Sequence, residues 1–144
     1  MTRLMRQSLF AAAMVLGVSG VALADSNCTL KTLRGSYYFA ANGYNMVAGV
    51  AQPKTIVEVI AFNGDGTLSV PAATRSLNGV IARSPAGGTG SYTVEAGCTG
   101  TIAFDGGPSF DIFVSPNGDE MTSIATGPAG NAGSFTPSRR VWPK

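Results

Sequence analysis

Short β-rich runs, broken every few residues by glycine, asparagine, aspartate or proline, constrain this chain more than any other feature. The run Thr55–Phe62 (TIVEVIAF) is the strongest of them. The segment that follows, Asn63–Gly66 (NGDG), supplies residue pairs that accept a positive φ, as tight hairpin turns require. After residue 24 no window sustains apolar residues at the i, i+3, i+4 spacing of an amphipathic helix. The sequence therefore predicts an all-β fold.

The turn residues divide the chain into eight or nine short strands. They cover residues 35–41, 55–62, 67–73, 91–95, 99–104, 109–115 and 120–126, with weaker segments at 79–81 and 134–137. Pro71 predicts an edge, a bulge or an early end to pairing within its strand. Short connections favour antiparallel neighbours, and closure removes the two bare edges of an open sheet. We expect an antiparallel up-and-down β-barrel of about eight strands, with a two-sheet β-sandwich as the alternative.

The first 24 residues have the features of a secretory signal peptide. Arg3 and Arg6 precede an apolar run at residues 9–16, and the small residues Ala22 and Ala24 suit cleavage after position 24. The apolar run is short for a membrane span, although an uncleaved anchor is the alternative. The expected organisation is a signal peptide at residues 1–24 and a single barrel domain at residues 25–144. Such a protein is exported, either periplasmic or extracellular, without stable membrane insertion.

Charge excludes some classes of partner. Arg3 and Arg6 account for the formal net charge of +2, because the remaining eight basic and eight acidic residues balance. Nothing in this balance predicts a basic patch that would steer the protein to nucleic acid or to an anionic membrane, so no nucleic-acid partner is expected. The low charge density gives little electrostatic protection against self-association, and the oligomeric state stays open.

Two cysteines, Cys28 and Cys98, remain in the expected mature chain. An oxidising compartment favours a disulfide between them. The bridge would close a 70-residue loop, which the chain-entropy account values at about 4 kcal/mol. Two free thiols or a catalytic cysteine are the competing interpretations. A catalytic cysteine needs a base such as histidine, and the chain contains no histidine.

Period-two alternation assigns one face of each strand to the interior. The run Thr55–Phe62 is ambiguous because both of its faces are partly apolar, and Glu58 marks its own face as outward or as facing a wet interior. The predicted core consists of Tyr37, Phe39, Val57, Val59, Leu68, Val70, Tyr92, Val94, Ile102, Phe104, Phe110, Ile112 and Val114. An eight-stranded interior is either filled by such side chains or holds one small ligand.

No catalytic or metal-binding pattern is visible. Without histidine there is no Ser-His-Asp triad and no imidazole ligand. The spacing of the acidic candidates for general acid–base chemistry brings no two together; they are Glu58, Glu95, Asp105 and Asp111. The turn at residues 63–67 begins like a calcium loop, but Thr74 stands where that loop has its bidentate glutamate. We expect no metal and no cofactor.

Three segments carry a resemblance to known proteins: residues 28–39 (CTLKTLRGSYYF), 62–68 (FNGDGTL) and 90–101 (GSYTVEAGCTGT), of which the first and the last are the most specific. Together they resemble a group of small exported bacterial proteins of uncharacterised function, which look like lipocalin-type (calycin) barrels. The tripeptide Gly35-Ser36-Tyr37 is similar to the Gly-x-Trp that opens lipocalin barrels, with tyrosine in place of tryptophan. The resemblance implies a barrel fold and transfers no functional residue.

Three functions are compatible with these observations. The leading one is a lipocalin-like module that binds a small, mostly apolar ligand in its open end; the lining residues would be Tyr37, Phe39, Tyr92, Phe104 and Phe110. The second is a structural or interaction protein with a filled barrel. The third is a cyclase- or isomerase-type enzyme, which the lack of histidine disfavours. A fully packed interior would exclude the first function, and two carboxylates facing one cavity would favour the third.

Overall fold

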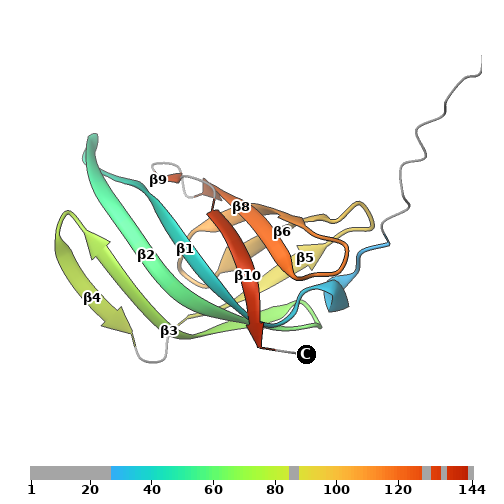
Figure 1. The fold of residues 1–144 in the computed structure, drawn as a ribbon. Helices are drawn as coiled ribbons and strands as arrows, with labels where there is room; N and C mark the ends of the chain where they lie inside the picture. Colours follow the sequence, from blue (N-terminus) through green and yellow to red (C-terminus); the bar gives the residue numbers. More distant parts are fainter. Residues whose placement is uncertain (1–26, 85–87, 128–130, 134–135, 143–144) are drawn as a thin grey trace, which may run out of the picture.

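The computed structural model describes residues 27–84, 88–127, 131–133 and 136–142. The expected signal peptide lies outside these residues. Within them, eight strands form a closed antiparallel barrel (Figure 1), namely β1 (Arg34–Val47), β2 (Val50–Asn63), β3 (Thr67–Leu77), β5 (Thr89–Val94), β6 (Thr99–Phe104), β7 (Ser109–Val114), β8 (Glu120–Gly127) and β10 (Thr136–Trp142). The barrel closes because β10 pairs with both β8 and β1. The predicted eight-stranded barrel is confirmed, and the sandwich alternative is not the fold.

Three short elements lie outside this ring of strands. The strand β4 (Val80–Ser84) pairs with β3, and β9 (Asn131–Gly133) pairs with β1. The 3-10 helix η1 (Leu30–Thr32) precedes β1. In Figure 1 the β1–β2 and β3–β4 hairpins project to one side of the barrel, whereas η1 lies at the opposite side.

The two projecting hairpins have tight two-residue turns. Ala48 and Gly49 have φ of 49° and 81°, and Asn78 and Gly79 have φ of 49° and 84°. Positive φ at both central residues is the geometry of type I′ turns, which match the twist of paired strands. Both hairpins extend further than the strands expected at residues 35–41 and 79–81, because Gly, Asn and Ala in these segments carry little strand signal.

Two prolines lie where the strand pairing changes. The carbonyl of Pro53 accepts a hydrogen bond from the Asn78 amide, just beyond the last β2–β3 pair, so its missing N–H costs no ladder bond. Pro71 lies at an irregularity where the β2–β3 register shifts, which confirms the predicted bulge. Residues 67–69 of β3 pair with β5, whereas residues 73–77 pair with β4. The bulge is thus the point where β3 leaves the barrel wall.

The core contains aromatic and aliphatic side chains from β1, β2, β3, β5, β6, β7 and β8, and also Leu33 before β1. In β10, the described side chains at residues 138–141 include the buried Ser138. The buried cluster is Leu33, Tyr37, Phe39, Ile60, Phe62, Leu68, Val70, Tyr92, Ile102, Phe110, Ile112, Val114 and Met121. The prediction for β2 was wrong: Val57 is 52% exposed and Val59 faces the same outer side. The opposite set, which includes Glu58, faces inward. Val94 and Phe104 are only partly buried.

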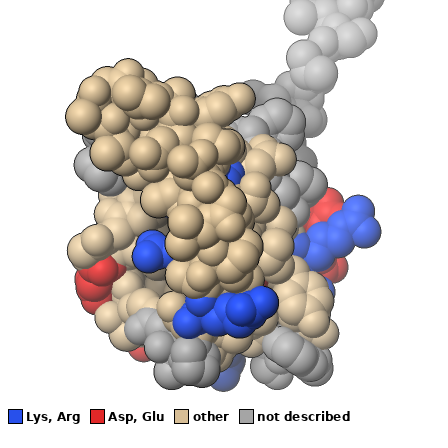
Figure 2. Space-filling view, turned by 90° about the vertical axis from the view of Figure 1, so that its left-hand side faces the viewer, with Lys and Arg blue, Asp and Glu red and all other residues tan. Residues whose placement is uncertain are grey.

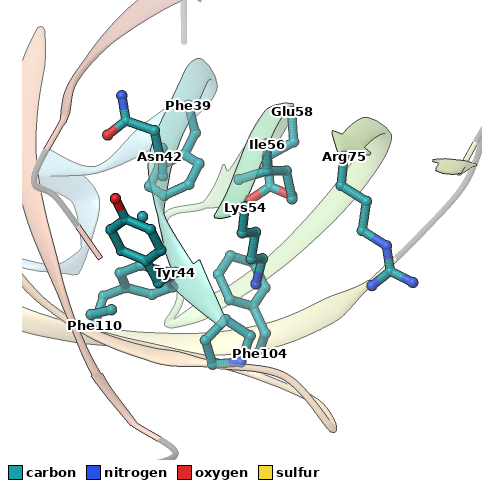
Figure 3. A pocket seen from close by; sticks show the side chains of 13 residues that line it. Phe39, Asn42, Tyr44, Lys54, Ile56, Glu58, Arg75, Phe104 and Phe110 are labelled. Atoms are coloured by element: carbon teal, nitrogen blue, oxygen red, sulfur yellow. The ribbon is translucent and has the colours of Figure 1, made fainter. Parts of the chain in front are cut away.

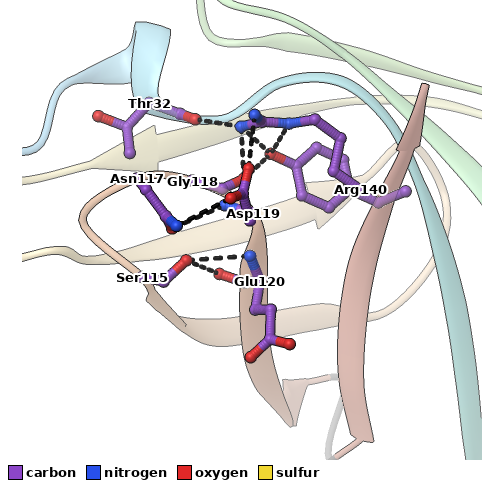
Figure 4. Close-up of polar contacts among 8 residues, drawn as sticks. Thr32, Ser115, Asn117, Gly118, Asp119, Glu120 and Arg140 are labelled. Carbon is purple, nitrogen blue, oxygen red and sulfur yellow. Dashed lines mark hydrogen bonds and ion pairs between the residues drawn. The ribbon is translucent and has the colours of Figure 1, made fainter. Parts of the chain in front are cut away.

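One end of the barrel is closed by a network of hydrogen bonds around Arg140 (Figure 4). Its guanidinium donates to the Tyr37 hydroxyl and to the carbonyls of Thr32 and Gly118, and it forms an ion pair of 2.9 Å with Asp119. Its Cζ also lies 5.5 Å from the centroid of the Tyr37 ring. These contacts join β10, β1, η1 and the β7–β8 turn.

The predicted disulfide lies at this same closed end. Cys28 and Cys98 are bonded, with their Cα atoms 5.0 Å apart. Cys98 has a φ of 61° in the β5–β6 turn, and its carbonyl accepts a bond from the Val114 amide. Nearby, the Tyr92 hydroxyl donates to the carbonyls of Leu30 and Leu33, at 3.0 and 2.9 Å. The segment before β1 is therefore fixed both covalently and by hydrogen bonds.

Candidate functional site at the open end of the barrel

The other end of the barrel contains a cavity of about 170 Å³ (Figure 3). The strands β1, β2 and β3 form one wall, and the ends of β6, β7 and β8 form the other. The lining residues are Phe39, Ala41, Asn42, Gly43, Tyr44, Lys54, Ile56, Glu58, Arg75, Phe104, Pro108, Phe110 and Ala125. The engineered apolar cavity that binds benzene has a volume of about 150 Å³. This cavity therefore has room for a body of about one aromatic ring.

Three phenylalanines form the apolar part of the cavity. Phe110 lies in edge-to-face contact with Phe39, at a centroid distance of 5.5 Å, and with Phe104, at 6.0 Å. Figure 3 shows Phe104 and Phe110 across the cavity from Ile56 and Glu58. Because edge-to-face packing holds each ring against the next, the cavity has a defined apolar shape rather than a loose interior.

Glu58 is the exceptional residue of this site. Its register partners are Phe39 on β1 and Ala73 on β3, and it is only 9% exposed. Burial raises the pKa of its carboxyl to about 7, with Lys54 partly offsetting the rise. The described residues give this carboxyl no hydrogen bond and no ion pair. The carboxyl oxygens are not fully enclosed, since Ser138 Oγ is the buried side-chain polar atom that lacks a partner among the described residues. They therefore open into the cavity, where a ligand could hydrogen-bond to them.

Two cations lie on the same face at the outer part of the cavity. Lys54 pairs with Leu77, and the neighbouring inward residue Ile56 pairs with Arg75, so Lys54 and Arg75 are diagonal neighbours. Neither forms an ion pair with a described residue. The cavity therefore combines an apolar interior, a protonatable carboxyl and a positively charged mouth.

The structure brings together three of the five ligand-lining residues expected from the sequence. Phe39, Phe104 and Phe110 line the cavity. Tyr37 and Tyr92 lie at the closed end instead, where both contact Phe62, at ring-centroid distances of 5.2 and 4.9 Å. Burial raises the pKa of both tyrosine hydroxyls. Binding of a ligand by any of these residues stays a prediction.

Sequence reasoning missed Glu58, Lys54 and Arg75 as members of one site. One signal was present: an acidic residue within the otherwise apolar run Thr55–Phe62. This acidic residue, Glu58, predicts either an outward face or a wet interior, and its position in the cavity fits the wet interior. Lys54 and Arg75 gave no comparable signal, because their proximity depends on the β2–β3 register.

Acid–base chemistry and metal binding both depend on the acidic residues near the cavity. Glu58 is the one carboxyl that lines the cavity among the described residues. The same part of the chain holds no group of three or more Cys, Asp and Glu side chains placed to bind a metal ion. It also contains no helix long and apolar enough to span a membrane.

Comparison of the chain with models of protein families, with curated proteins and with solved structures found no match.

Proposed function

We propose that this protein binds one small, mostly apolar molecule in the open end of its barrel, as a lipocalin-like binding module outside the cytoplasm. The observation that carries the proposal is the cavity of about 170 Å³, in which the buried Glu58 lies beside Phe39 on one wall and faces Phe104 and Phe110 on the other. Small-molecule sites commonly combine an apolar lining with a few convergent polar groups. The Cys28–Cys98 disulfide is compatible with an exported protein.

The site favours a ligand with a compact apolar body and one hydrogen-bonding group. The apolar body packs among Phe39, Phe104 and Phe110, and the polar group meets the Glu58 carboxyl. A hydroxyl suits this carboxyl in either protonation state, since it donates to the ionised form and accepts from the protonated form. A negatively charged extension would be stabilised by Lys54 and Arg75 at the mouth.

Two measurements test this proposal. Native mass spectrometry of the protein purified from its own host, without detergent, would detect a co-purified small molecule. Isothermal titration with p-cresol, which has one ring and one hydroxyl, would measure binding directly. We expect saturable binding at one site per chain, weakened by Glu58→Gln.

A pair of alanines provides a matched control. Ala125 lines the cavity, whereas Ala103 is exposed on the outer face of β6. Ala125→Leu should fill the cavity and abolish p-cresol binding, and Ala103→Leu should leave it unchanged. Absence of both a co-purified molecule and p-cresol binding, or equal effects of the two substitutions, would count against the proposal.

A further inference from the structure

The ends of the two projecting hairpins expose apolar side chains. We define the hairpin tips as residues 44–53 of β1–β2 and residues 76–82 of β3–β4. Val50 is 62% exposed and Val80 is 71% exposed. Other large apolar side chains exposed at the tips are Tyr44, Met46, Val47 and Ile81. A group of exposed apolar residues at one end of a molecule marks an interaction site more often than scattered ones do.

The tips are also free of charge. Residues 35–53 and 76–82 contain no Asp, Glu, Lys or Arg. Figure 2 faces the side to which the hairpins project and shows an upper lobe without charged atoms, with basic residues below it and acidic residues towards the margins. The strand β9, which pairs with Gly43–Asn45, is uncharged as well.

The first charged side chains behind the tips are basic on β2, β3 and β4. They are Lys54, Arg75 and Arg83. Arg75 shares the cavity face with Lys54, whereas Arg83 pairs with Thr74 on the outer face. The cations therefore flank the apolar tips on both faces. Glu58 lies deeper and is buried, and Asp105, on the β6–β7 turn, accepts a hydrogen bond from Thr89.

We propose that the hairpin tips dock on an anionic lipid surface. Lys54 follows Val50 by four residue steps along β2, a rise of about 13 Å. Apolar faces of interfacial segments enter the boundary between headgroups and acyl chains by about 5–10 Å. At that depth Lys54, Arg75 and Arg83 lie at the level of the lipid phosphates, and Tyr44 lies in the interface that tyrosine favours.

Charge favours a lipid surface over a second copy of this chain. A second copy of the chain presents the same three cations and no complementary acidic group at its tips, so charge adds nothing to a tip-to-tip dimer. An anionic bilayer instead neutralises all three at once. Each such cation near an anionic leaflet strengthens binding by about fivefold. The balanced net charge of the chain outside residues 1–24 conceals this local excess.

Docking at the tips also places the open end of the barrel near the bilayer. Tyr44, Lys54 and Arg75 line the cavity as well as the region behind the tips. The inference does not depend on the proposed ligand, because the tips are defined by their own exposure and charge. Its test measures vesicle binding, and p-cresol titration of the same variants reports on the cavity separately.

The test is cosedimentation of the exported protein with sucrose-loaded vesicles. One set is phosphatidylcholine alone, and the other is an equal mixture of phosphatidylcholine and phosphatidylglycerol. We expect binding to the mixed vesicles that decreases at higher salt. The double variant Val50→Asp/Val80→Asp should reduce it at least about tenfold, since it introduces two anions into the apolar tips. Arg83→Gln should reduce binding by about fivefold.

Matched controls separate the tips from the rest of the surface. Phe113→Asp removes an equally exposed apolar side chain from the barrel wall, and Lys31→Gln removes a cation from the closed end. Both should leave vesicle binding unchanged. If the aspartate pair impairs folding, judged by circular dichroism and thermal melting, Val50→Thr/Val80→Thr keeps the β-branched shape and tests the same loss. The assayed protein starts at residue 25, because the apolar run at residues 9–16 would itself bind vesicles.

Three results would overturn the inference. The first is no binding to the mixed vesicles. The second is equal binding by the tip variant and the wild type. The third is a dimer in analytical ultracentrifugation that the tip substitutions dissociate, which would identify the tips as a self-association surface.

Discussion

The two ends of this barrel differ in how their buried polar side chains are hydrogen-bonded. At the closed end, the hydroxyls of Tyr37 and Tyr92 and the guanidinium of Arg140 all bond to backbone carbonyls. At the open end, Glu58 is buried to a similar degree, and the described residues give its carboxyl no partner. Hydrogen-bonded buried groups stabilise a structure, whereas a carboxyl that opens into a cavity can accept or donate a bond to another molecule. The hydrogen bonds at the closed end stabilise the fold, and the carboxyl that opens into the cavity at the open end is consistent with the ligand binding proposed above.

The largest expected effect tests how tightly the closed end is built. Gly118 has a φ of 69°, and a Cβ atom there would lie 2.0 Å from the Thr32 carbonyl oxygen. Gly106 has a nearly equal φ of 66° but nothing within 4 Å. Gly118→Ala should therefore cost more than about 3 kcal/mol of unfolding free energy, while Gly106→Ala costs about 1 kcal/mol for its left-handed backbone alone. Urea denaturation measures both, and equal losses would show that the backbone contact is not limiting.

The disulfide should contribute the next largest share of stability. Cys28→Ser/Cys98→Ser removes a cross-link that closes a 70-residue loop at the closed end. We expect a loss of about 2–4 kcal/mol and a melting temperature lower by many degrees. Dithiothreitol should reproduce this shift in the wild type and leave the double variant unaffected. A wild-type melting temperature that does not respond to reduction would show that the bridge contributes little to the closed end.

The same contrast explains which parts of the molecule the sequence could predict. The strand pattern, the barrel and the disulfide follow from local signals: alternation, turn residues and two cysteines. The Tyr37–Arg140 contact joins residues 103 positions apart, and nothing local relates them. The face of β2 was misassigned because Val57 and Val59 are as apolar as the true core residue Ile60.

The open end was less predictable than the barrel that carries it. Phe39, Phe104 and Phe110 could be named because alternation and aromatic character point inward together. The projecting hairpins could not be predicted from the sequence, because they require the bulge at Pro71 and pairing between segments rich in Gly and Asn. The β2–β3 pairing that continues into these hairpins places Lys54 and Arg75 at the mouth of the cavity that Glu58 lines, so the polar part of the site depends on long-range register.

Glu58 should make the open end sensitive to pH. Its pKa is raised from 4.5 in the unfolded chain to about 7 in the fold, so the folded state holds the proton more tightly. The stability that this group contributes is therefore fully present below pH 4.5, decreases as the pH rises, and is lost above pH 7. The total decrease in unfolding free energy is about 3 kcal/mol at most. Glu58→Gln should be more stable than the wild type at pH 8 and should lack this decrease between pH 5 and 8. Urea denaturation at the two pH values measures it.

If the unfolding free energy of the Glu58→Gln variant still decreases between pH 5 and 8, another group causes the pH dependence. The matched variant is Glu95→Gln, because Glu95 is exposed in the β5–β6 turn. It should retain the wild-type decrease. A ligand whose hydroxyl bonds to Glu58 should also reduce the decrease in the wild type, which would link stability at the open end to occupancy of the cavity.

The smallest expected effect distinguishes the ion pair of Arg140 from its hydrogen bonds as the interaction that stabilises the closed end. Arg140 pairs with Asp119 while its own side chain is only 12% exposed, whereas Arg139 pairs with Glu120 and is 78% exposed. Asp119→Asn should cost about 0.5–1 kcal/mol and Glu120→Gln close to zero, since exposed ion pairs contribute little. Urea denaturation measures both losses of unfolding free energy, and higher salt should reduce the difference between the Asp119→Asn and Glu120→Gln variants. A loss for Asp119→Asn as large as that for Gly118→Ala would mean that the ion pair, rather than the carbonyls of Thr32 and Gly118, orients Arg140. The closed end would then resemble the open end in depending on a single charged group.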